Sequence, residues 1–419
     1  MRIHIRNGRI VDPATGKDTQ GDLFIADGKI AEEFARPDRV IDAKGLVVAP
    51  GFVDLAARLR EPGFEYKATL ESELDAAAAG GVTRLACPPD TDPPLDEPGL
   101  VDMLRRRASA LSRARVHPVG ALTVKLAGEA LTEMGQLTDA GCVAFSQGNR
   151  SMPDNQVLWR ALQYAATFGY KVWLRAEDGA LARGGVAHDG EMATRLGLPG
   201  IPSFAETIAL GGLIELVRAT GARVHLCRLS TASAVELVRR AKAEKLPLTC
   251  DVGIHHLHLS DMDLGYFDSH CRLEPPLRSQ RDRDALSRGL ADGVVDCLVS
   301  DHTPVDEDGK HLPFAEAEPG ATGLELLLPL ALKWGEAQKL PLAATLGRIT
   351  TEPARILGVE AGRIALGAPA DLAIFDPRAA FQVSPQNLKS QGKNTPFLGY
   401  ELAGRVRYTL LAGSVVYEA

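Results

Sequence analysis

The sequence predicts an α/β fold in which a (β/α)8 TIM-like barrel carries a small β-sandwich domain formed by both termini. The chain has 419 residues, which is enough for one barrel of ~250 residues and a smaller second domain. Strand-like and helix-like segments alternate through its middle, whereas both ends consist of short strands broken by Gly and Asp turns. We expect the β-sandwich to comprise residues 1–52 and 360–419, and the barrel to comprise residues 53–359.

The middle of the chain contains eight strand candidates separated by helical stretches. A helix predicted at 68–79 ends at Gly80, and another at 205–220 ends at Gly221, because glycine commonly follows the last turn of a helix. Eight parallel strands alternating with helices are typical of a closed barrel, whose chemistry lies at the carboxyl ends of the strands. The strand candidates are 47–57, 82–87, 116–122, 142–146, 171–176, 223–229, 248–255 and 294–301.

Composition excludes several classes of protein. Hydrophobic residues make up 45% of the chain and charged residues 24%, which are ordinary globular values. The net charge of −7 argues against nucleic acid or an anionic membrane as the main partner. No apolar signal core opens the chain, and its most apolar stretch, 326–332, is too short to span a bilayer. We therefore expect a soluble, cytoplasmic protein whose six scattered cysteines are free thiols.

The end of the first strand candidate carries a family resemblance. It reads Pro50-Gly-Phe-Val-Asp-Leu-Ala-Ala-Arg-Leu-Arg-Glu-Pro-Gly63, which resembles the dihydroorotase signature of the amidohydrolase superfamily, where His-x-His precedes Leu-Arg-x-Pro-Gly. Further matches follow in the family's order along nearly the whole chain. They include Ala176-Glu-Asp178, the stretch 194–202, Pro275-Pro-Leu-Arg278, Ser300-Asp-His302 and Pro369-Ala-Asp-Leu372.

This resemblance implies a chemistry that the residues do not support. The family hydrolyses or closes the cyclic amide dihydroorotate with divalent metal, normally zinc, which activates water. The family places its metal ligands after strands one, four, five, six and eight. In this chain, Asp301 is the only residue at those positions that could still bind a metal. Alanine offers no ligand atom and a guanidinium offers no lone pair, so we expect no metal, no cofactor and no catalysis. The degenerate ligand positions hold Ala56, Arg58, Gln147, Arg175 and Arg228.

The positions that would bind substrate are also altered. Arg60 matches the family arginine that grips the substrate carboxylate, a role that suits its planar fork. Asp90 stands where the family has an asparagine, and an aspartate would repel that carboxylate. The lid after strand eight keeps Pro319 and Gly320, but Val305 replaces the histidine that normally follows the Asp-His-x-Pro motif. The resemblance therefore implies a remnant of a substrate site.

The three arginines at former histidine positions have two interpretations. They could form a cationic cluster that holds an anion, or a buried ion-pair network with Asp301, Glu177 and Asp54. We expect the network, because an unpaired buried guanidinium costs several kcal/mol.

Several other polar residues have structural and functional interpretations. The pair His256 and His258 could form a displaced metal site, but no acidic partner stands at ligand spacing. We expect His302 to orient Asp301 or a loop carbonyl, and His225 to be a hydrogen-bonded core residue. The basic run 105–107, with its neighbours at 113 and 115, predicts a solvated helix face, with a subunit contact as the alternative.

The function that follows is a non-catalytic dihydroorotase-like protein of pyrimidine biosynthesis. The resemblance implies its partner, the catalytic chain of aspartate carbamoyltransferase, with homodimers of this chain inside a hetero-oligomer. Two alternatives remain. One is an active dihydroorotase, or another cyclic-amide hydrolase, with an atypical site. The other is a small-anion binding module that uses the arginine cluster.

Overall fold

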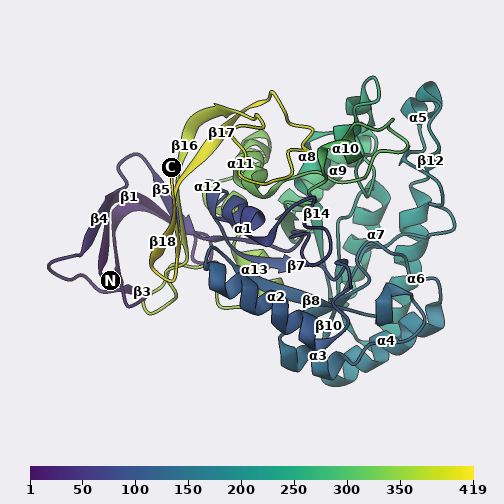
Figure 1. Cartoon of the computed structure of the whole chain (residues 1–419), viewed down its shortest axis with the longest axis horizontal. Helices are drawn as coiled ribbons and strands as arrows, with labels where there is room; N and C mark the ends of the chain where they lie inside the picture. Colours follow the sequence, from purple (N-terminus) through teal and green to yellow (C-terminus); the bar gives the residue numbers. More distant parts are fainter.

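The chain folds into a parallel-stranded barrel with a separate sheet at one side (Figure 1). A computed structural model describes residues 1–419. Both termini lie in the separate sheet, while the middle of the chain winds around the barrel (Figure 1). The predicted fold class is therefore confirmed.

Eight parallel strands form the barrel in chain order. Past the carboxyl ends of the first and last strands, a bridge between Ala57 and His302 joins them. Nearer their amino ends, the segment containing Arg348 and Ile349 inserts between these two strands. Val53 donates its amide hydrogen to the Ile349 carbonyl at 2.9 Å, and Leu298 donates to the Arg348 carbonyl at 3.0 Å. The strands are β6 (Phe52–Asp54), β7 (Val82–Cys87), β8 (Arg115–Ala121), β9 (Ala144–Ser146), β10 (Lys171–Leu174), β13 (Arg223–Leu226), β14 (Leu248–Gly253) and β15 (Cys297–Val299).

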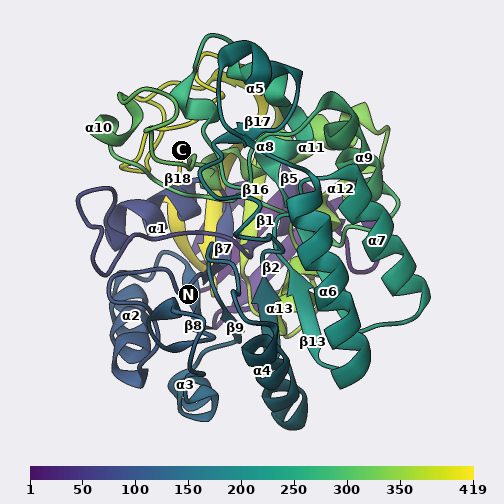
Figure 2. The same ribbon diagram turned by 90° about the vertical axis from the view of Figure 1, so that its right-hand side faces the viewer.

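Helices cover the outside of the barrel, and α4, α6 and α7 follow one another along one side (Figure 2). Thr69 caps the first helix by accepting a hydrogen bond from the Ser72 amide at 3.2 Å, and Gly221 ends α6 with a φ of +68°. The helices are α1 (Leu70–Ala79), α2 (Pro98–Leu111), α3 (Met134–Ala140), α4 (Asn155–Phe168), α5 (Glu191–Leu196), α6 (Phe204–Thr220), α7 (Ala232–Ala243), α8 (Ile254–His258), α9 (Gln280–Ala291), α10 (Glu307–Lys310), α11 (Leu327–Ala337), α12 (Leu342–Gly347) and α13 (Thr351–Leu357).

Shorter elements complete the loops above the barrel and beside it. A two-stranded parallel ribbon lies close to α5 in the chain, and four 3-10 turns interrupt the longer connections. These elements are β11 (Ala187–His188), β12 (Gly200–Ile201), η1 (Val124–Leu126), η2 (Asp261–Leu264), η3 (Ser269–Cys271) and η4 (Leu324–Leu326).

The two ends of the chain build one hydrogen-bonded sheet of eight strands. They join where β5 pairs antiparallel with β16, with Val48 opposite Ile374. Thirteen buried hydrophobic residues form the core of this domain. Its strands are β1 (Ile3–Asp12), β2 (Lys17–Ala26), β3 (Lys29–Ala31), β4 (Arg39–Asp42), β5 (Val47–Pro50), β16 (Leu372–Gln382), β17 (Glu401–Leu411) and β18 (Ser414–Glu418).

The first strand candidate needs a correction. Residues 47–57 do not form one strand, because β5 belongs to the terminal sheet and β6 to the barrel. Gly51 lies between them, where a Cβ atom would stand 2.3 Å from the side chain of Thr83. The candidate at 248–255 is also shorter than expected, since β14 ends at Gly253 and α8 begins at the next residue.

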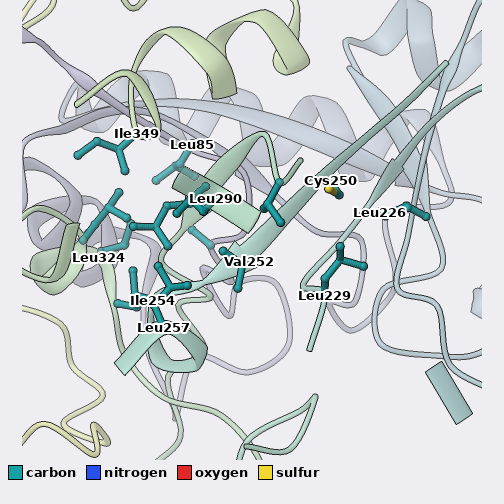
Figure 3. Close-up of a cluster of buried hydrophobic side chains, with 14 of the residues drawn as sticks. Leu85, Leu226, Leu229, Cys250, Val252, Ile254, Leu257, Leu290, Leu324 and Ile349 are labelled. Carbon is teal, nitrogen blue, oxygen red and sulfur yellow. The ribbon is translucent and has the colours of Figure 1, made fainter. Parts of the chain in front are cut away.

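Two apolar clusters fill the barrel region. The larger contains 76 buried residues from the barrel strands, the helices and the β5, β16 and β17 strands of the terminal sheet, and Val252, Ile254 and Leu290 lie within it (Figure 3). The smaller contains 12 buried residues, among them Val53 and Trp173. Side chains two residues apart on a strand share a face, so the second cluster fills the barrel interior. No helix has the length and hydrophobicity needed to cross a bilayer, and all six cysteines are free.

Candidate functional site

Four charged residues meet just beyond the carboxyl ends of the barrel strands. Arg58 follows β6, Arg175 follows β10, Arg228 follows β13 and Asp301 follows β15. Each is buried, with exposed fractions between 4% and 8%. Parallel strands end at the same rim of a barrel, which is why residues so distant in sequence form one centre.

Asp301 is paired with the arginines, as the sequence predicted. Its Oδ1 atom lies 3.0 Å from Arg228 Nη1 and 3.7 Å from Arg58 Nη1. Arg58 also donates from Nε to Asp90 Oδ2 at 2.9 Å. Asp90, expected to repel a substrate carboxylate, therefore neutralises an arginine instead.

Arg175 has carboxylate partners of its own. Both oxygens of Glu177 accept hydrogen bonds from its guanidinium at 2.8 Å, and Glu274 lies 3.6 Å away. A bidentate guanidinium–carboxylate pair is among the stronger charge-assisted contacts. The centre thus holds three guanidiniums and the four carboxylates of Asp90, Glu177, Glu274 and Asp301.

One asparagine connects all three arginines. The Oδ1 atom of Asn149 accepts hydrogen bonds from Arg58 Nη2, at 2.8 Å, and from Arg228 Nη2. Its backbone carbonyl accepts from Arg175 Nη2 at 2.7 Å, and its Nδ2 donates to Glu274 Oε2 at 2.9 Å. Sequence reasoning missed both Asn149 and Glu274. The one available signal was the place of Asn149 in the loop after β9, two residues beyond the degenerate ligand position 147.

The residues present do not fit a zinc ion at the family's position. Ala56 contributes only a methyl group, and Gln147 Oε1 is occupied by the Thr123 hydroxyl at 3.0 Å. The remaining cavity, lined partly by Ala56, Trp173 and Cys227, has a volume of about 20 Å³, roughly the space of a single water. One aspartate and three cations do not make a zinc site, which takes three or four lone-pair donors.

The electrostatics of the centre favour fully charged partners. Burial alone would raise the pKa of Asp90, but the charge and hydrogen bond of Arg58 outweigh it and hold that pKa below its ordinary value. Burial alone would lower the pKa of Arg228, but the negative charges around it, Asp301 first and then others such as Asp251 and Asp90, raise that pKa. The centre is therefore a mutually neutralised ion-pair network.

A second polar layer lies beneath this network, inside the barrel. His225 is hydrogen bonded through Nε2 to Asp251 Oδ2 and through Nδ1 to Thr249 Oγ1, both at 2.8 Å. Asp251 Oδ1 accepts the backbone N–H of Arg228 at 2.6 Å, which holds Arg228 in the left-handed region at φ +54°. His225 is thus the hydrogen-bonded core residue predicted. Asp251 was missed, because it resembles any polar residue within a strand.

Three possible metal ligands lie within 4.8 Å of one another in this layer. They are the imidazole of His225, the thiol of Cys227 and the carboxylate of Asp251. Both imidazole nitrogens of His225 already have hydrogen-bond partners. This group therefore serves to support Arg228 from below.

Two predicted roles are wrong. His302 does not orient Asp301: its Nε2 pairs with Glu73 of α1, and its Nδ1 accepts from the Gly323 amide at 3.1 Å. Asp54 does not join the arginine network, because it accepts hydrogen bonds from the amide, at 2.9 Å, and hydroxyl of Ser300. Both residues fasten the ends of β6 and β15 to their surroundings.

The histidine pair on α8 does not converge on one point. His256 Nε2 donates to the carbonyls of Pro275 and Pro276 at 3.2 Å, whereas His258 Nε2 donates to Leu330 at 2.9 Å. The two imidazoles thus bind different backbone segments.

The former substrate positions are occupied by internal contacts. Arg60 donates from Nε to the Pro304 carbonyl at 2.7 Å and lies over the ring of Phe64. Burial, followed by the charge of Arg58, lowers the pKa of Arg60 to about 10. The guanidinium expected to hold a substrate carboxylate is therefore directed at the protein itself.

The lid residues are held by the segment that returns to the terminal sheet. Gly320, which follows Pro319, donates to the Arg272 carbonyl at 2.9 Å and accepts from Asn394 Nδ2 at 3.0 Å. Asn394 also donates to the Thr303 carbonyl at 3.1 Å and accepts from the Val305 amide at 3.0 Å. This residue fastens the loop after β15 in two places.

Known proteins resemble this chain over its full length. The family described as dihydro-orotase-like matches residues 45–234, and the amidohydrolase family matches residues 201–417. A dihydroorotase-like protein of Pseudomonas aeruginosa is 46% identical, with 100% of both chains covered. A dihydroorotase of Geobacter sp. (strain M21) is 39% identical, again over 100% of both chains.

Two solved structures agree with the fold. The L-hydantoinase of Arthrobacter aurescens superposes with a TM-score of 0.88 at 26% identity, covering 99% of this chain and 96% of its own. A D-hydantoinase superposes with a TM-score of 0.85 at 24% identity, covering 100% of this chain and 95% of its own. The second likeness concerns the fold alone.

Proposed function

The chain belongs to the dihydroorotase-like family of amidohydrolases, and on that premise we propose that it is a non-catalytic member. Its role in this proposal is structural: it supports pyrimidine biosynthesis as a partner of the catalytic chain of aspartate carbamoyltransferase. The observation that carries the proposal is the ion-pair network where the family places its metal. Arg58, Arg175 and Arg228 occupy three ligand positions, and each has a carboxylate partner.

The network leaves no group free to start hydrolysis. The family reaction needs a water that is deprotonated near neutral pH, and a metal ion supplies that by lowering the pKa of the water. Asp301 could act as a general base, but its carboxylate is bonded to Arg228 at 3.0 Å. The former metal position also has almost no room, with about 20 Å³ left, and the cavity of about 520 Å³ that borders Arg175 and Glu177 lies beside it. Pairing of the arginines likewise removes the net positive charge that an anion-binding module at this centre would need.

Elemental analysis tests the loss of the metal. We expect the purified chain, expressed with zinc in the medium, to carry far less than one zinc per chain. About one zinc per chain in the native protein, lost on Asp301→Asn substitution, would overturn the proposal. A dihydroorotase prepared alongside serves as the positive control.

The partner is proposed from the family resemblance together with the preserved frame. The eight-stranded barrel and the terminal sheet are both intact, and the changes concentrate at the strand ends. A protein altered only there keeps its outer surface for assembly. We propose homodimers of this chain that bridge trimers of aspartate carbamoyltransferase.

Co-expression followed by size-exclusion chromatography tests this assembly. We expect the two chains to elute together, and carbamoyltransferase activity or stability to fall when this chain is removed. Separate elution at micromolar concentration, with unchanged carbamoyltransferase activity, would overturn the partner proposal without affecting the absence of catalysis.

The second candidate function is an active cyclic-amide hydrolase with an atypical site. It is favoured by the activities of the relatives, since one is a dihydroorotase at 39% identity and another is an L-hydantoinase of the same fold. Assays with dihydroorotate, dihydrouracil and hydantoin separate the two functions. Turnover that a metal chelator abolishes would favour the hydrolase.

A further inference from the structure

A second cationic region lies at the opposite end of the barrel, where β8 begins. A cavity of about 510 Å³ opens there between α2, the start of β8, Gly141 at the end of α3 and the turn joining β17 to β18. Figure 2 shows α2, α3 and β8 close together on this side of the barrel. We call this cavity the floor pocket.

The floor pocket is lined by hydrogen-bond donors and by no acidic residue. Three basic side chains and three hydroxyl groups share its wall with backbone and small apolar groups. The polar lining residues are Arg105, Ser109, Ser112, Arg115, His117 and Ser414.

The cations of the floor pocket are not neutralised as those of the ion-pair network are. Arg115 shares the carboxylate of Asp371 with Arg84, at 3.0 and 2.9 Å, so that one acid serves two guanidiniums. Arg105 uses one N–H to donate to the Ala140 carbonyl at 2.6 Å and has no carboxylate partner. The Nε2 atom of His117 is buried without a hydrogen-bond partner.

The charged groups around His117 show the same excess of positive charge. Burial is the first cause that lowers its pKa to about 4, and the other causes are all cations: Arg84, Arg115, Arg105 and Lys171. A site where each nearby charge opposes protonation is a site that attracts an anion.

We propose that the floor pocket binds a phosphate-bearing small molecule. Guanidiniums present paired N–H groups that match phosphate oxygens, and the hydroxyls of Ser109 and Ser414 supply further donors. The volume lies within the ~300–1,000 Å³ of small-molecule sites, so it admits a sugar phosphate or a nucleotide. Such a ligand would contact both the barrel and the terminal sheet, because Ser414 lies in β18 and Ser109 in α2.

Isothermal titration calorimetry of the full chain tests this proposal. The probes are inorganic pyrophosphate, ribose 5-phosphate and adenosine 5′-monophosphate, with ribose and adenosine as uncharged controls. We expect saturable binding of at least one phosphorylated probe, no binding of the controls, and weakening at high salt because the attraction is electrostatic. Ribose 5-phosphate and the nucleotide distinguish the two sources of the phosphate ester.

Two matched pairs of variants locate the binding. Arg105→Gln should weaken binding by at least about tenfold, whereas Arg106→Gln, on the same helix but outside the pocket, should change it by less than about twofold. Ser109→Leu should fill the pocket and abolish binding without a change of charge, and Ala110→Leu serves as its control. Ser109 is exposed on α2, so this substitution leaves the core intact.

Two results would overturn the proposal. One is that none of the three phosphorylated probes binds saturably with a Kd below about 10 mM. The other is an equal loss with Arg105→Gln and Arg106→Gln while Ser109→Leu still binds, since that would mean attraction to the whole basic helix face.

Discussion

The two ends of the barrel differ in how their positive charges are neutralised. At the carboxyl end, three guanidiniums meet four carboxylates and the amide of Asn149, and the cavity at the former metal position has a volume of only about 20 Å³. At the amino end, Arg84 and Arg115 share Asp371, Arg105 has no acid, and a cavity of about 510 Å³ stays open.

Solvent access explains the difference. The guanidiniums of the network are 4–8% exposed, and a buried charge without a partner costs several kcal/mol. The side chain of Arg115 is 36% exposed, and Arg105 is exposed on α2, so water can solvate their charge. The carboxyl end thus holds a neutralised, buried network, while the amino end keeps an open cavity with exposed cations.

The largest expected effect comes from removing the acid of the network. Asp301→Ala leaves Arg228 and Arg58 without their shared carboxylate, and we expect the free energy of unfolding to fall by roughly 3–5 kcal/mol. Urea unfolding followed by circular dichroism measures it. As a control, Asp292→Ala removes a carboxylate that is 58% exposed and 3.5 Å from Arg239, and should cost less than about 1 kcal/mol. Equal effects would contradict a buried network.

The next effect concerns the amide that connects the arginines. Asn149→Ala removes the acceptor shared by Arg58 and Arg228, and should lower the free energy of unfolding by roughly 1–3 kcal/mol. The matched substitution is Asn387→Ala, whose side chain makes one exposed hydrogen bond to Gln382. We expect that variant to stay within about 0.5 kcal/mol of the native protein. A neutral Asn149→Ala would mean that water replaces the amide.

The two ends should also titrate in different pH ranges. The pKa of His117 is lowered to about 4 in the folded chain, whereas an unfolded histidine has a pKa of about 6.5. Between these values the unfolded state binds more protons, so stability falls as pH drops from about 6.5 toward 4. Asp90, with its lowered pKa, destabilises the fold only when pH falls below its unfolded value of about 3.9.

His117→Gln should therefore reduce the loss of stability between pH 7 and pH 5, by about 1–2 kcal/mol given the partial exposure of the imidazole. Urea midpoints at the two pH values measure it. The exposed His311→Gln variant, whose imidazole is 71% exposed, should keep the native slope. Identical slopes for all three proteins would show that the pKa of His117 is not lowered in the folded chain.

The smallest expected effect comes from returning two of the family's histidines to the former metal position. Ala56→His combined with Arg58→His returns two imidazoles, but Gln147, Arg175 and Arg228 still contribute no suitable metal ligands. We expect no zinc uptake and no dihydroorotate turnover. Metal-dependent turnover by the double variant would show that the active centre lies elsewhere than in the arginine network.

The frame was predictable because its signals are local. Glycines mark the ends of α1 and α6, and apolar runs mark the strands, so the elements follow from periodicity. The split at Gly51 was not predictable in the same way. The residues on both sides are apolar, and only pairing of Val48 with Ile374 and of Phe52 with Val82 assigns them to different sheets.

The candidate site was predictable only where a motif marks it. Arg58, Arg175, Arg228 and Asp301 stand at motif positions, and their pairing follows from the cost of buried charge. Asn149 belongs to a loop without periodicity. The pairing of His302 with Glu73 joins residues 229 positions apart, a separation that no local pattern encodes.

The most direct test is a dihydroorotase assay of the purified chain in both directions, with zinc in excess. The guanidiniums of the ion-pair network offer no lone pairs to a metal, and its carboxylates are paired with them, so we expect no turnover above the rate without protein. Turnover that rises with zinc and disappears with a metal chelator would contradict this expectation, because the chain would then hold a catalytic metal.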